Sequence, residues 1–370
     1  MPLKKGKFSL IKTAIILLNL VAVTGLTGAI LATYIPPSLL PFLSVLALIY
    51  PILLIVNLAF VLLWIVLKSK WFLLSLLIIF LGFSNIYRNF QISGNTSSGQ
   101  DPSHVKVLSY NVQLFGLIED KSNVQQKRNE VLKFIQSEAP QVICMQEYYS
   151  VGITPYAPLE DMKTELKLNT HYYESYFSPK HNQLTGLVIF SKYPAVDKGK
   201  LKFQGTRTFG IFTDLLINED TVRVYNIHLA SIQLLPADID FVVNAGQEKE
   251  ENIKQHALSI YSKLTDAFLL RELQMSYLVD QLSDCSYPVI LCGDFNDTPS
   301  SYVYDQITSE LRDCFRDEGK GFGVTYAGQI PFLRIDYIMK SDHFNTLHYN
   351  RQKIDLSDHF PLSASFTLNR

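Results

Sequence analysis

Several short apolar segments of this sequence run directly into carboxylates and amides. In YPVILCGDFNDTPSS, the apolar run Val289–Cys292 indicates a short buried strand, and a glycine then lets the chain turn. Asp294, Asn296 and Asp297 follow at once. Such groups are costly to bury unless something binds them. The segment therefore predicts a bound partner at the end of this strand.

The same arrangement recurs at five other places in the chain. A single Asn or Asp after a strand is usually a turn former, but six such strand ends indicate one shared site. Oxygen-rich groups at one sheet edge suit a hard divalent cation such as Mg²⁺ or Mn²⁺. Histidines beside carboxylates suit charge stabilisation around a phosphate. The side chains placed in this way are Asn111, Gln146, Glu147, Asn226, His228, Asp294, Asn296, Asp336, Asp358 and His359.

The elements that must hold these side chains lie beyond Val105. Residues 123–139 have helical spacing, which Pro140 ends. Many strands with few helices between them predict one α/β domain over residues 105–370. Strand-like patterns occur in VKVLSYNV, QVICMQE, GLVIFS, FGIFTDLLI, VRVYNIHL, PVILCGDFN, RIDYIM and LSASFTL.

One long connection stands apart in this domain, over residues 230–284. It begins with the apolar segment IQLLP and continues with helical spacing at Ile253, Leu258, Leu264 and Phe268. Two interpretations are open. The connection is either a packed surface helix or helix pair, or a lid or membrane-facing insert, because long connections in compact domains are often functional.

The first hundred residues are apolar and contain no Asp or Glu. Three apolar runs cover about residues 11–34, 39–67 and 71–87; the first two are long enough to span a bilayer, and the third is near the lower limit. They predict a transmembrane region of three helices over residues 1–90, followed by a polar linker over 91–104. Fully buried helices of a soluble protein are the alternative interpretation.

Basic residues around these runs indicate an orientation in the cell membrane. Lysines precede the first run and occur in KSK, residues 68–70, whereas the connection YIPPSLLP is uncharged. The positive-inside rule places both basic segments in the cytoplasm, so a multi-pass protein with three spans has its folded domain on the extracytoplasmic side. Loss of the third span would reverse that side. Cys285 and Cys314 could form a disulfide in an oxidising compartment, which the sequence leaves undecided.

The charge of the chain is unevenly distributed. All 34 acidic residues but only 26 of the 33 basic ones lie beyond Gln100, so this part carries a formal charge of −8 that the whole-chain value of −1 conceals. Surfaces that grip long nucleic acids are usually basic. The composition therefore argues against a processive or tightly gripping nuclease.

The ordered series of strand-end motifs resembles the endonuclease/exonuclease/phosphatase superfamily. That superfamily includes pancreatic-type deoxyribonucleases, apurinic endonucleases, neutral sphingomyelinases and inositol polyphosphate 5-phosphatases. The resemblance covers about residues 105–368 and implies a four-layered α/β sandwich, with two mixed sheets face to face and helices outside. It also implies Mg²⁺-dependent hydrolysis of a phosphate ester. The matching motifs, in the family's order, are SYNV, MQE, GLVIFSKYP, NIHL, GDFND, RIDYI and SDHFP.

The resemblance assigns roles to the polar residues around the expected ion. Glu147 is similar to the principal metal ligand of the family, and Asn111 and Asp358 are similar to residues that help to hold the ion. Asp294 resembles the residue that aligns or deprotonates the attacking water. Asn296 resembles the amide that holds a phosphate oxygen.

The histidines receive roles in the same way. His359 resembles the histidine that contacts the scissile phosphate, with Asp336 hydrogen-bonded behind it to fix its tautomer. His228 matches a second histidine of the deoxyribonuclease and sphingomyelinase branches. An alternative for Asp336 is a structural salt bridge to Arg334 in a core strand.

The substrate stays open at this level. A nucleic acid and a phospholipid head group or small phosphoester are both compatible with a phosphodiester-cleaving site, and the apolar N-terminal region favours a lipid. The predicted partners are the lipid bilayer and a phosphodiester substrate, and the sequence indicates no protein partner. A membrane-bound binding or scaffold protein that has lost activity on the same fold is the alternative from another class, although no expected motif residue is missing.

Overall fold

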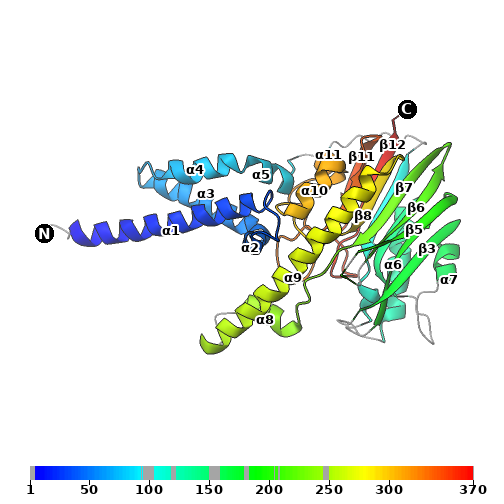
Figure 1. Ribbon diagram of the computed structural model, residues 1–370, viewed down its shortest axis with the longest axis horizontal. Helices are drawn as coiled ribbons and strands as arrows, with labels where there is room; N and C mark the ends of the chain where they lie inside the picture. Colours follow the sequence, from blue (N-terminus) through cyan, green and yellow to red (C-terminus); the bar gives the residue numbers. More distant parts are fainter. Residues whose placement is uncertain are drawn as a thin grey trace. The chain divides into compact units, whose positions relative to one another are not determined.

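The chain forms two compact units in the computed structural model (Figure 1). One consists of Met1–Asn89 with Thr298–Asp305, and the other of Phe90–Asp297 with Gln306–Arg370. Most of the predicted linker 91–104 lies outside the described residues. Those residues are 5–92, 94, 104–117, 122–149, 159–178, 183–203, 205–206, 209–244 and 250–369.

Helices make up the N-terminal unit, and only the first is one continuous membrane-length helix. Its segment Leu10–Leu31 is long and apolar enough to cross a membrane. The second and third predicted runs are helix pairs bent by 70° and 62°, so each is a span only if it crosses as a broken helix. Pro51 follows the first break and cannot continue a preceding helix, and Gly82 lies at the second. The helices are α1 (Lys5–Leu31), α2 (Pro41–Leu48), α3 (Tyr50–Val66), α4 (Phe72–Leu81) and α5 (Phe83–Asn89).

The prediction of three spanning helices, at 11–34, 39–67 and 71–87, is confirmed for the first run as a membrane-length helix, and the second and third runs are spans only if each bent pair crosses the membrane. Buried polar side chains nevertheless join the helices of this unit. Trp64 Nε1 of α3 donates to Asn19 Oδ1 of α1 at 2.9 Å, and Asn19 Nδ2 donates to Ser75 Oγ of α4 at 2.6 Å. Hydrogen bonds of this kind hold apolar helices together where no water is present.

Two six-stranded sheets form the centre of the second unit. Their strand orders are β11-β12-β1-β2-β4-β3 and β5-β6-β7-β8-β10-β9. Each is mixed: β1 and β2 are parallel in the first sheet, β7 and β8 are parallel in the second, and the remaining neighbours are antiparallel. The strands are β1 (Val105–Asn111), β2 (Val142–Tyr148), β3 (Thr170–Ser178), β4 (Gln183–Ser191), β5 (Ala195–Lys202), β6 (Phe209–Ile217), β7 (Asp220–His228), β8 (Val289–Asp294), β9 (Arg312–Asp313), β10 (Asp336–Lys340), β11 (Phe344–Arg351) and β12 (Leu362–Leu368).

Alternation along the strands places one apolar set between the sheets and another outside them. Val107 and Cys144 belong to a core cluster that includes residues of both sheets. Their neighbours Leu108 and Met145 face the opposite way and pack in a cluster with apolar residues of α6 (Val124–Glu138). The result is an α/β fold of two mixed sheets flanked by helices, as the resemblance implied. The shorter helical elements are η1 (Gln113–Gly116), α7 (Leu159–Glu165), α10 (Tyr302–Glu310) and α11 (Cys314–Glu318).

The connection 230–284 forms α8 (Pro236–Asn244) and α9 (Glu250–Ser283). The C-terminal half of the 34-residue helix α9 is packed, since Phe268, Met275 and Leu278 are buried. Its first half, beside α8, extends away from the sheets (Figure 1). Of the two interpretations, a packed surface helix describes the half of α9 that is nearest to the sheets.

The cysteines do not form the disulfide that the sequence left open. All four are free thiols. Cys314 is fully buried in the core between the sheets, whereas Cys285 is partly exposed after α9. Burial raises the pKa of the Cys314 thiol well above its usual value, so this side chain behaves as a small apolar residue.

Candidate active site

The two parallel strand pairs end at the same place. Asn111 closes β1 opposite Gln146 of β2, and His228 closes β7 opposite Asp294 at the end of β8. β10 begins at Asp336, which pairs with Asp294 from the other side. Because carboxyl ends of parallel neighbours meet at one edge of a sheet, the fold gathers side chains that are far apart in the sequence.

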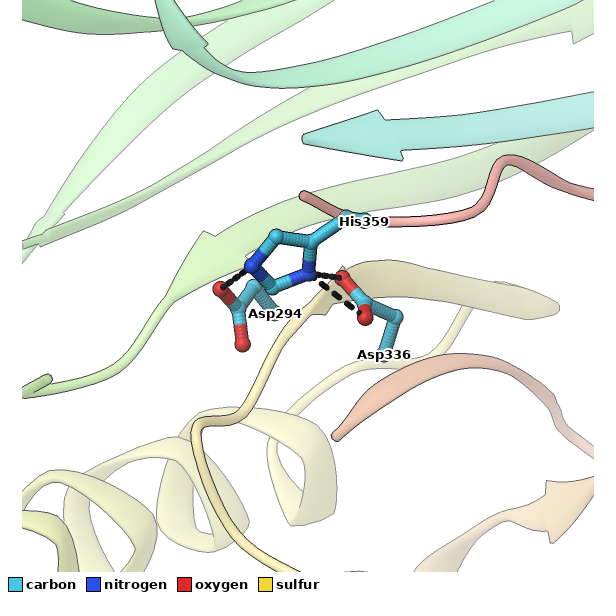
Figure 2. Close-up of side chains that lie close together, drawn as sticks. All are labelled: Asp294, Asp336 and His359. Atoms are coloured by element: carbon cyan, nitrogen blue, oxygen red, sulfur yellow. Dashed lines mark hydrogen bonds and ion pairs between the residues drawn. The ribbon is translucent and has the colours of Figure 1, made fainter. Parts of the chain in front are cut away.

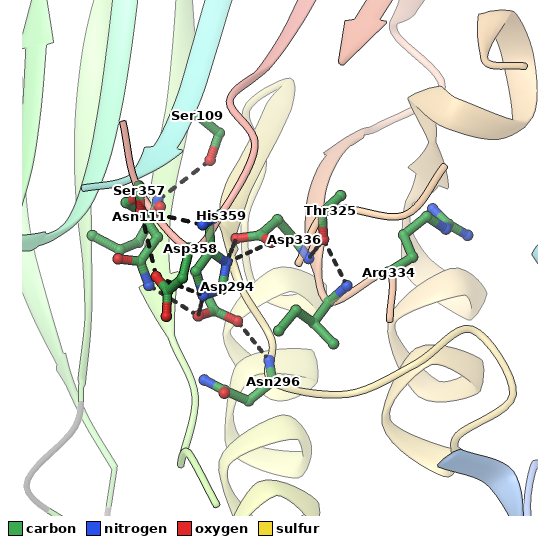
Figure 3. A network of polar contacts seen from close by, with 12 residues as sticks. Ser109, Asn111, Asp294, Asn296, Thr325, Arg334, Asp336, Ser357, Asp358 and His359 are labelled. Carbon is green, nitrogen blue, oxygen red and sulfur yellow. Dashed lines mark hydrogen bonds and ion pairs between the residues drawn. The ribbon is translucent and has the colours of Figure 1, made fainter. Parts of the chain in front are cut away.

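Asp294 is the centre of this group, and its carboxylate is almost completely buried (Figure 3). Its Oδ2 accepts a hydrogen bond from Asn111 Nδ2 at 3.1 Å. The same oxygen lies 3.7 Å from Nε2 of His228 and 3.7 Å from Nε2 of His359. Its Oδ1 accepts the backbone N–H of Asn296 at 2.8 Å. One carboxylate thus contacts residues from four different chain segments.

His359 lies between two carboxylates (Figure 2). Its Nδ1 is 2.8 Å and 3.0 Å from the two oxygens of Asp336, while Nε2 faces Asp294. Thr325 Oγ1 accepts the backbone N–H of Asp336 at 3.0 Å and so holds the start of β10 in place. Arg334 forms its buried ion pair with Asp313 instead, at 2.6 Å. The alternative pairing of Asp336 with Arg334 is therefore wrong.

Glu147 and Asp358 complete the cluster at its more open side. Glu147 Oε1 lies 4.0 Å from His228 Nε2, and Asp358 Oδ1 lies 3.9 Å from His359 Nε2. Their side chains are 16% and 32% exposed, against 2% for Asp294, so these two carboxylates are the ones an entering ion or substrate meets. The structure brings the site residues that the sequence predicted into this one cluster: Asn111, Glu147, His228, Asp294, Asn296, Asp336, Asp358 and His359.

The backbone is strained at two of these positions. Glu147 and Asn296 have φ values of 50° and 53°, in the left-handed region that residues other than glycine rarely adopt. Glu147 occupies an irregularity in β2, where its pairing with β4 shifts register. Strain of this kind clusters at functional sites, where the surrounding structure holds a side chain in a required direction.

The carboxylates and imidazoles shift one another's protonation. Burial raises the pKa of Asp294, and so does the nearby Asp336, while His359, His228 and the Asn296 N–H act in the opposite direction. For His359, burial alone would lower the pKa, but Asp336 and Asp294 outweigh it and raise this pKa well above its usual value. The geometry thus favours a charged imidazole beside a buried carboxylate.

Two sets of residues in this cluster could hold a metal ion. Ligand atoms of Asp294, Asp336 and His359 lie within 4.8 Å of one another. However, Nδ1 of His359 is already bonded to Asp336, which suits an oriented imidazole better than a ligand. Asn111, Glu147 and Asp358 offer oxygen donors, which a hard divalent cation prefers. By donor type, these three residues suit such an ion.

Several supporting residues were not assigned a role from the sequence. Gln146 Nε2 donates to Asn226 Oδ1 at 2.7 Å, and Asn226 Nδ2 donates to the carbonyl oxygens of Met145 and Val188 at 2.9 Å. These fully buried amides join the two sheets beneath Glu147 and His228. Their strand-end positions were visible in the sequence, but the bonds between sheets were not. Thr325 and Ser357 had no strand-end signal of that kind; Ser357 Oγ donates to the Asn111 carbonyl oxygen at 2.8 Å.

Comparison with known families agrees with this geometry. Residues 108–359 match the Endonuclease/Exonuclease/phosphatase family, and the chain belongs to that family. Its members are hydrolases of phosphoester bonds that depend on divalent metal ions. Residues 12–89 match a separate family described as a Domain of unknown function (DUF8431). No curated protein matches the chain.

Solved structures show the same fold at low sequence identity. An endonuclease/exonuclease/phosphatase from Beutenbergia cavernae is 17% identical, with a TM-score of 0.52 over 72% of each chain. The human Nocturnin catalytic domain, solved with a bound sulfate anion, is also 17% identical, with a TM-score of 0.52 over 72% of this chain and 95% of that one. A family protein from Bacteroides thetaiotaomicron is 16% identical, with a TM-score of 0.52 over 72% of this chain and 98% of that one.

Proposed function

We propose that this protein is a membrane-attached, metal-dependent phosphoesterase that hydrolyses phosphodiester bonds by in-line attack of water. The observation that carries the proposal is the set of contacts around Asp294, which joins both histidines and an amide to one buried carboxylate. Family membership supports the reaction class.

Asp294 is the residue that aligns the attacking water and accepts its proton. A carboxylate whose pKa is raised by burial is a stronger base than one in water. Asn111 and the Asn296 backbone each donate to one oxygen of this carboxylate, so the carboxylate faces the water in a single orientation. The Asn296 side chain gives one amide hydrogen to the Leu229 carbonyl oxygen at 3.2 Å, and its second hydrogen suits a phosphate oxygen.

His359 is the cation that stabilises the negative charge of the transition state. Asp336 accepts from Nδ1 and keeps the ring oriented, so Nε2–H points away from Asp336 and into the cluster. His228, between Glu147 and Asp294, contacts the phosphate from the other side. Asn111, Glu147 and Asp358 would hold a Mg²⁺ or Mn²⁺ ion, which would supply Lewis-acid charge neutralisation at the phosphate.

Membrane attachment is the second part of the proposal. α1 is long and apolar enough to span a bilayer, and each bent pair of helices adds a span if it crosses as a broken helix. A total of one span or three puts the phosphoesterase domain opposite to the basic N-terminus, on the extracytoplasmic side of the cell membrane. The charge of −8 beyond Gln100 and the apolar N-terminal unit favour a lipid head group over a long nucleic acid.

The direct test uses the full chain purified in detergent. With Mg²⁺, it should cleave bis-p-nitrophenyl phosphate, lose this activity on chelation, and lose it again in the Asp294→Asn variant. Sphingomyelin, phosphoinositides, DNA and RNA then separate the substrate classes. Absence of metal-dependent hydrolysis on all of these diesters would contradict the proposal and favour the alternative, a catalytically silent membrane-bound binding or scaffold protein.

A further inference from the structure

We propose that Arg271 and Gln274, on one face of α9, are positioning residues that hold the two catalytic loops of this site at a set spacing. The proposal rests on the phosphoesterase function above and gives the long connection 230–284 a role in it. The loops concerned follow β7 and β8, which end at His228 and Asp294. Arg271 and Gln274 are three residues apart and therefore share one side of the helix.

Arg271 forms a buried contact with each loop. Its guanidinium is fully buried, which is rare for arginine unless it is paired. Nε lies 3.1 Å from Asp297 Oδ2, in the loop after β8, and Nη1 donates to the Ala230 carbonyl oxygen at 3.1 Å, in the loop after β7. The ring of Phe268, one turn earlier on α9, lies 4.9 Å from the guanidinium carbon. The Arg271 side chain thus joins the loop after β7 to the loop after β8.

Gln274 holds the same stretch of backbone from its other side. Its Oε1 accepts the N–H of Ala230 at 2.8 Å, and its Nε2 donates to Thr206 Oγ1 at 3.1 Å. Both backbone groups of Ala230 are therefore bonded to α9, one to Gln274 and one to Arg271. Gln274 is 1% exposed, so water competes little for these bonds.

The residues that Arg271 and Gln274 contact are joined to the catalytic groups by backbone and side-chain hydrogen bonds. The Leu229 N–H donates to the Asp294 carbonyl oxygen at 2.9 Å, and Asn296 Nδ2 donates to the Leu229 carbonyl oxygen. Leu229 lies between His228 and Ala230, and Asn296 lies between Asp294 and Asp297. A shift of Ala230 or Asp297 would therefore move the two loops apart and change the distance between His228 and Asp294. The hydrogen bonds and ion pair described for Arg271 go to the loops and to neither reacting group, although its charge also acts on Asp294 through space.

Arg271→Met and Asp297→Asn in the full chain test this role. Each removes one charge of the pair with little change in volume. We expect kcat on bis-p-nitrophenyl phosphate to fall by about tenfold to a hundredfold, with a smaller change in KM, because support of catalytic groups is lost and not substrate contact. The matched control is the ion pair of Lys263 in α9 with Asp238 in α8, at 2.5 Å; Lys263→Met should leave kcat unchanged.

Hydrogen exchange gives a second measurement that does not depend on activity. In Arg271→Met, peptides that cover 228–231 and 294–297 should exchange faster, and in Lys263→Met they should not. Unchanged exchange in these peptides, or a folded Arg271→Met variant with the parent's kcat, would overturn the role of Arg271. If the parent itself hydrolyses nothing, the proposed function fails while the exchange measurement still decides the role of Arg271. If Arg271→Met does not fold, Asp297→Asn decides by both measurements.

Discussion

Glu147 holds its carboxylate at the open side of the site from a strained backbone position. Its φ of 50° and the register shift in β2 turn the side chain toward the cluster, where His228 is 4.0 Å away. A carboxylate held in a fixed direction is well placed to act as a metal ligand.

Glu147→Gln keeps the shape of this side chain and removes its charge. We expect Mg²⁺-dependent hydrolysis of bis-p-nitrophenyl phosphate to fall by at least about a hundredfold, since the ion loses its main negative ligand. The control is Glu165→Gln, which changes a carboxylate paired with Arg128. A Glu147→Gln variant as active as the parent would refute the assignment of this ligand.

His359 and Asp336 act as one unit in the proposed mechanism. His359→Ala should abolish most turnover, and Asp336→Asn should reduce it severely because the imidazole loses the carboxylate that charges and orients it. The double variant should be little worse than His359→Ala, since both changes remove one function. The measurement is a double-mutant cycle of kcat/KM beside melting curves; losses that multiply would break the proposed dyad.

At the scale of elements, two charged residues near the start of β10 make contacts with different roles, one in the site and one in the core. Asp336 at its start serves the site, whereas Arg334, two residues earlier, belongs to the core. Arg334 lies over the rings of Phe315 and Tyr337 and pairs with Asp313, which also accepts the Phe315 N–H at the start of α11. Asp336 bonds to His359 of the site, whereas the ion pair described for Arg334 is with Asp313.

Asp313→Asn tests the structural contact by removing the carboxylate that pairs with the buried Arg334. We expect the domain to lose about 3–5 kcal/mol of unfolding free energy, because removing one partner of a buried ion pair is strongly destabilising. The kcat of the folded fraction should stay near that of the parent. Denaturation followed beside turnover checks both expectations. Asp342→Asn, in the exposed pair with Arg312, is the control and should change stability little.

At the scale of the whole molecule, the proposed membrane attachment would place the folded domain on a side of the membrane that depends on the number of spans. The helices α1 to α5 allow one span, or up to three if each bent pair crosses. With the N-terminus in the cytoplasm, as the positive-inside rule predicts, odd totals would place the domain outside and a total of two would return it to the cytoplasm. The side of the membrane determines which phosphodiesters the site can meet.

Reporter fusions after Asp101 in a bacterial host decide this point. We expect an alkaline phosphatase fusion to be active and a fluorescent protein fusion to be dark, because the basic N-terminus stays in the cytoplasm. The matched controls are the same reporters placed after Lys70. The reverse result after Asp101, an inactive phosphatase and a bright fluorescent protein, would put the domain in the cytoplasm.

The sequence by itself indicated the family, through the order of its strand-end motifs, and the residues that gather at one place in the fold. Strand-end Asn, Asp, Glu and His residues in a set order indicated one cluster, and the structure brings them together at the ends of β1, β2, β7 and β8. This inference succeeded because the end of a strand is a local property, readable from a short apolar run and the residue after it. The apolar N-terminal runs were visible for the same reason.

Only the tertiary structure decided which side chains pair. The sequence left Asp336 with two candidate partners, and the fold gives it His359 and leaves Arg334 to Asp313. It also bends the second and third apolar runs, which composition alone presents as continuous. The link from Arg271 to the catalytic loops was likewise hidden. Such pairings join residues far apart in the chain, and neither local propensity nor periodicity carries information on which distant side chains meet.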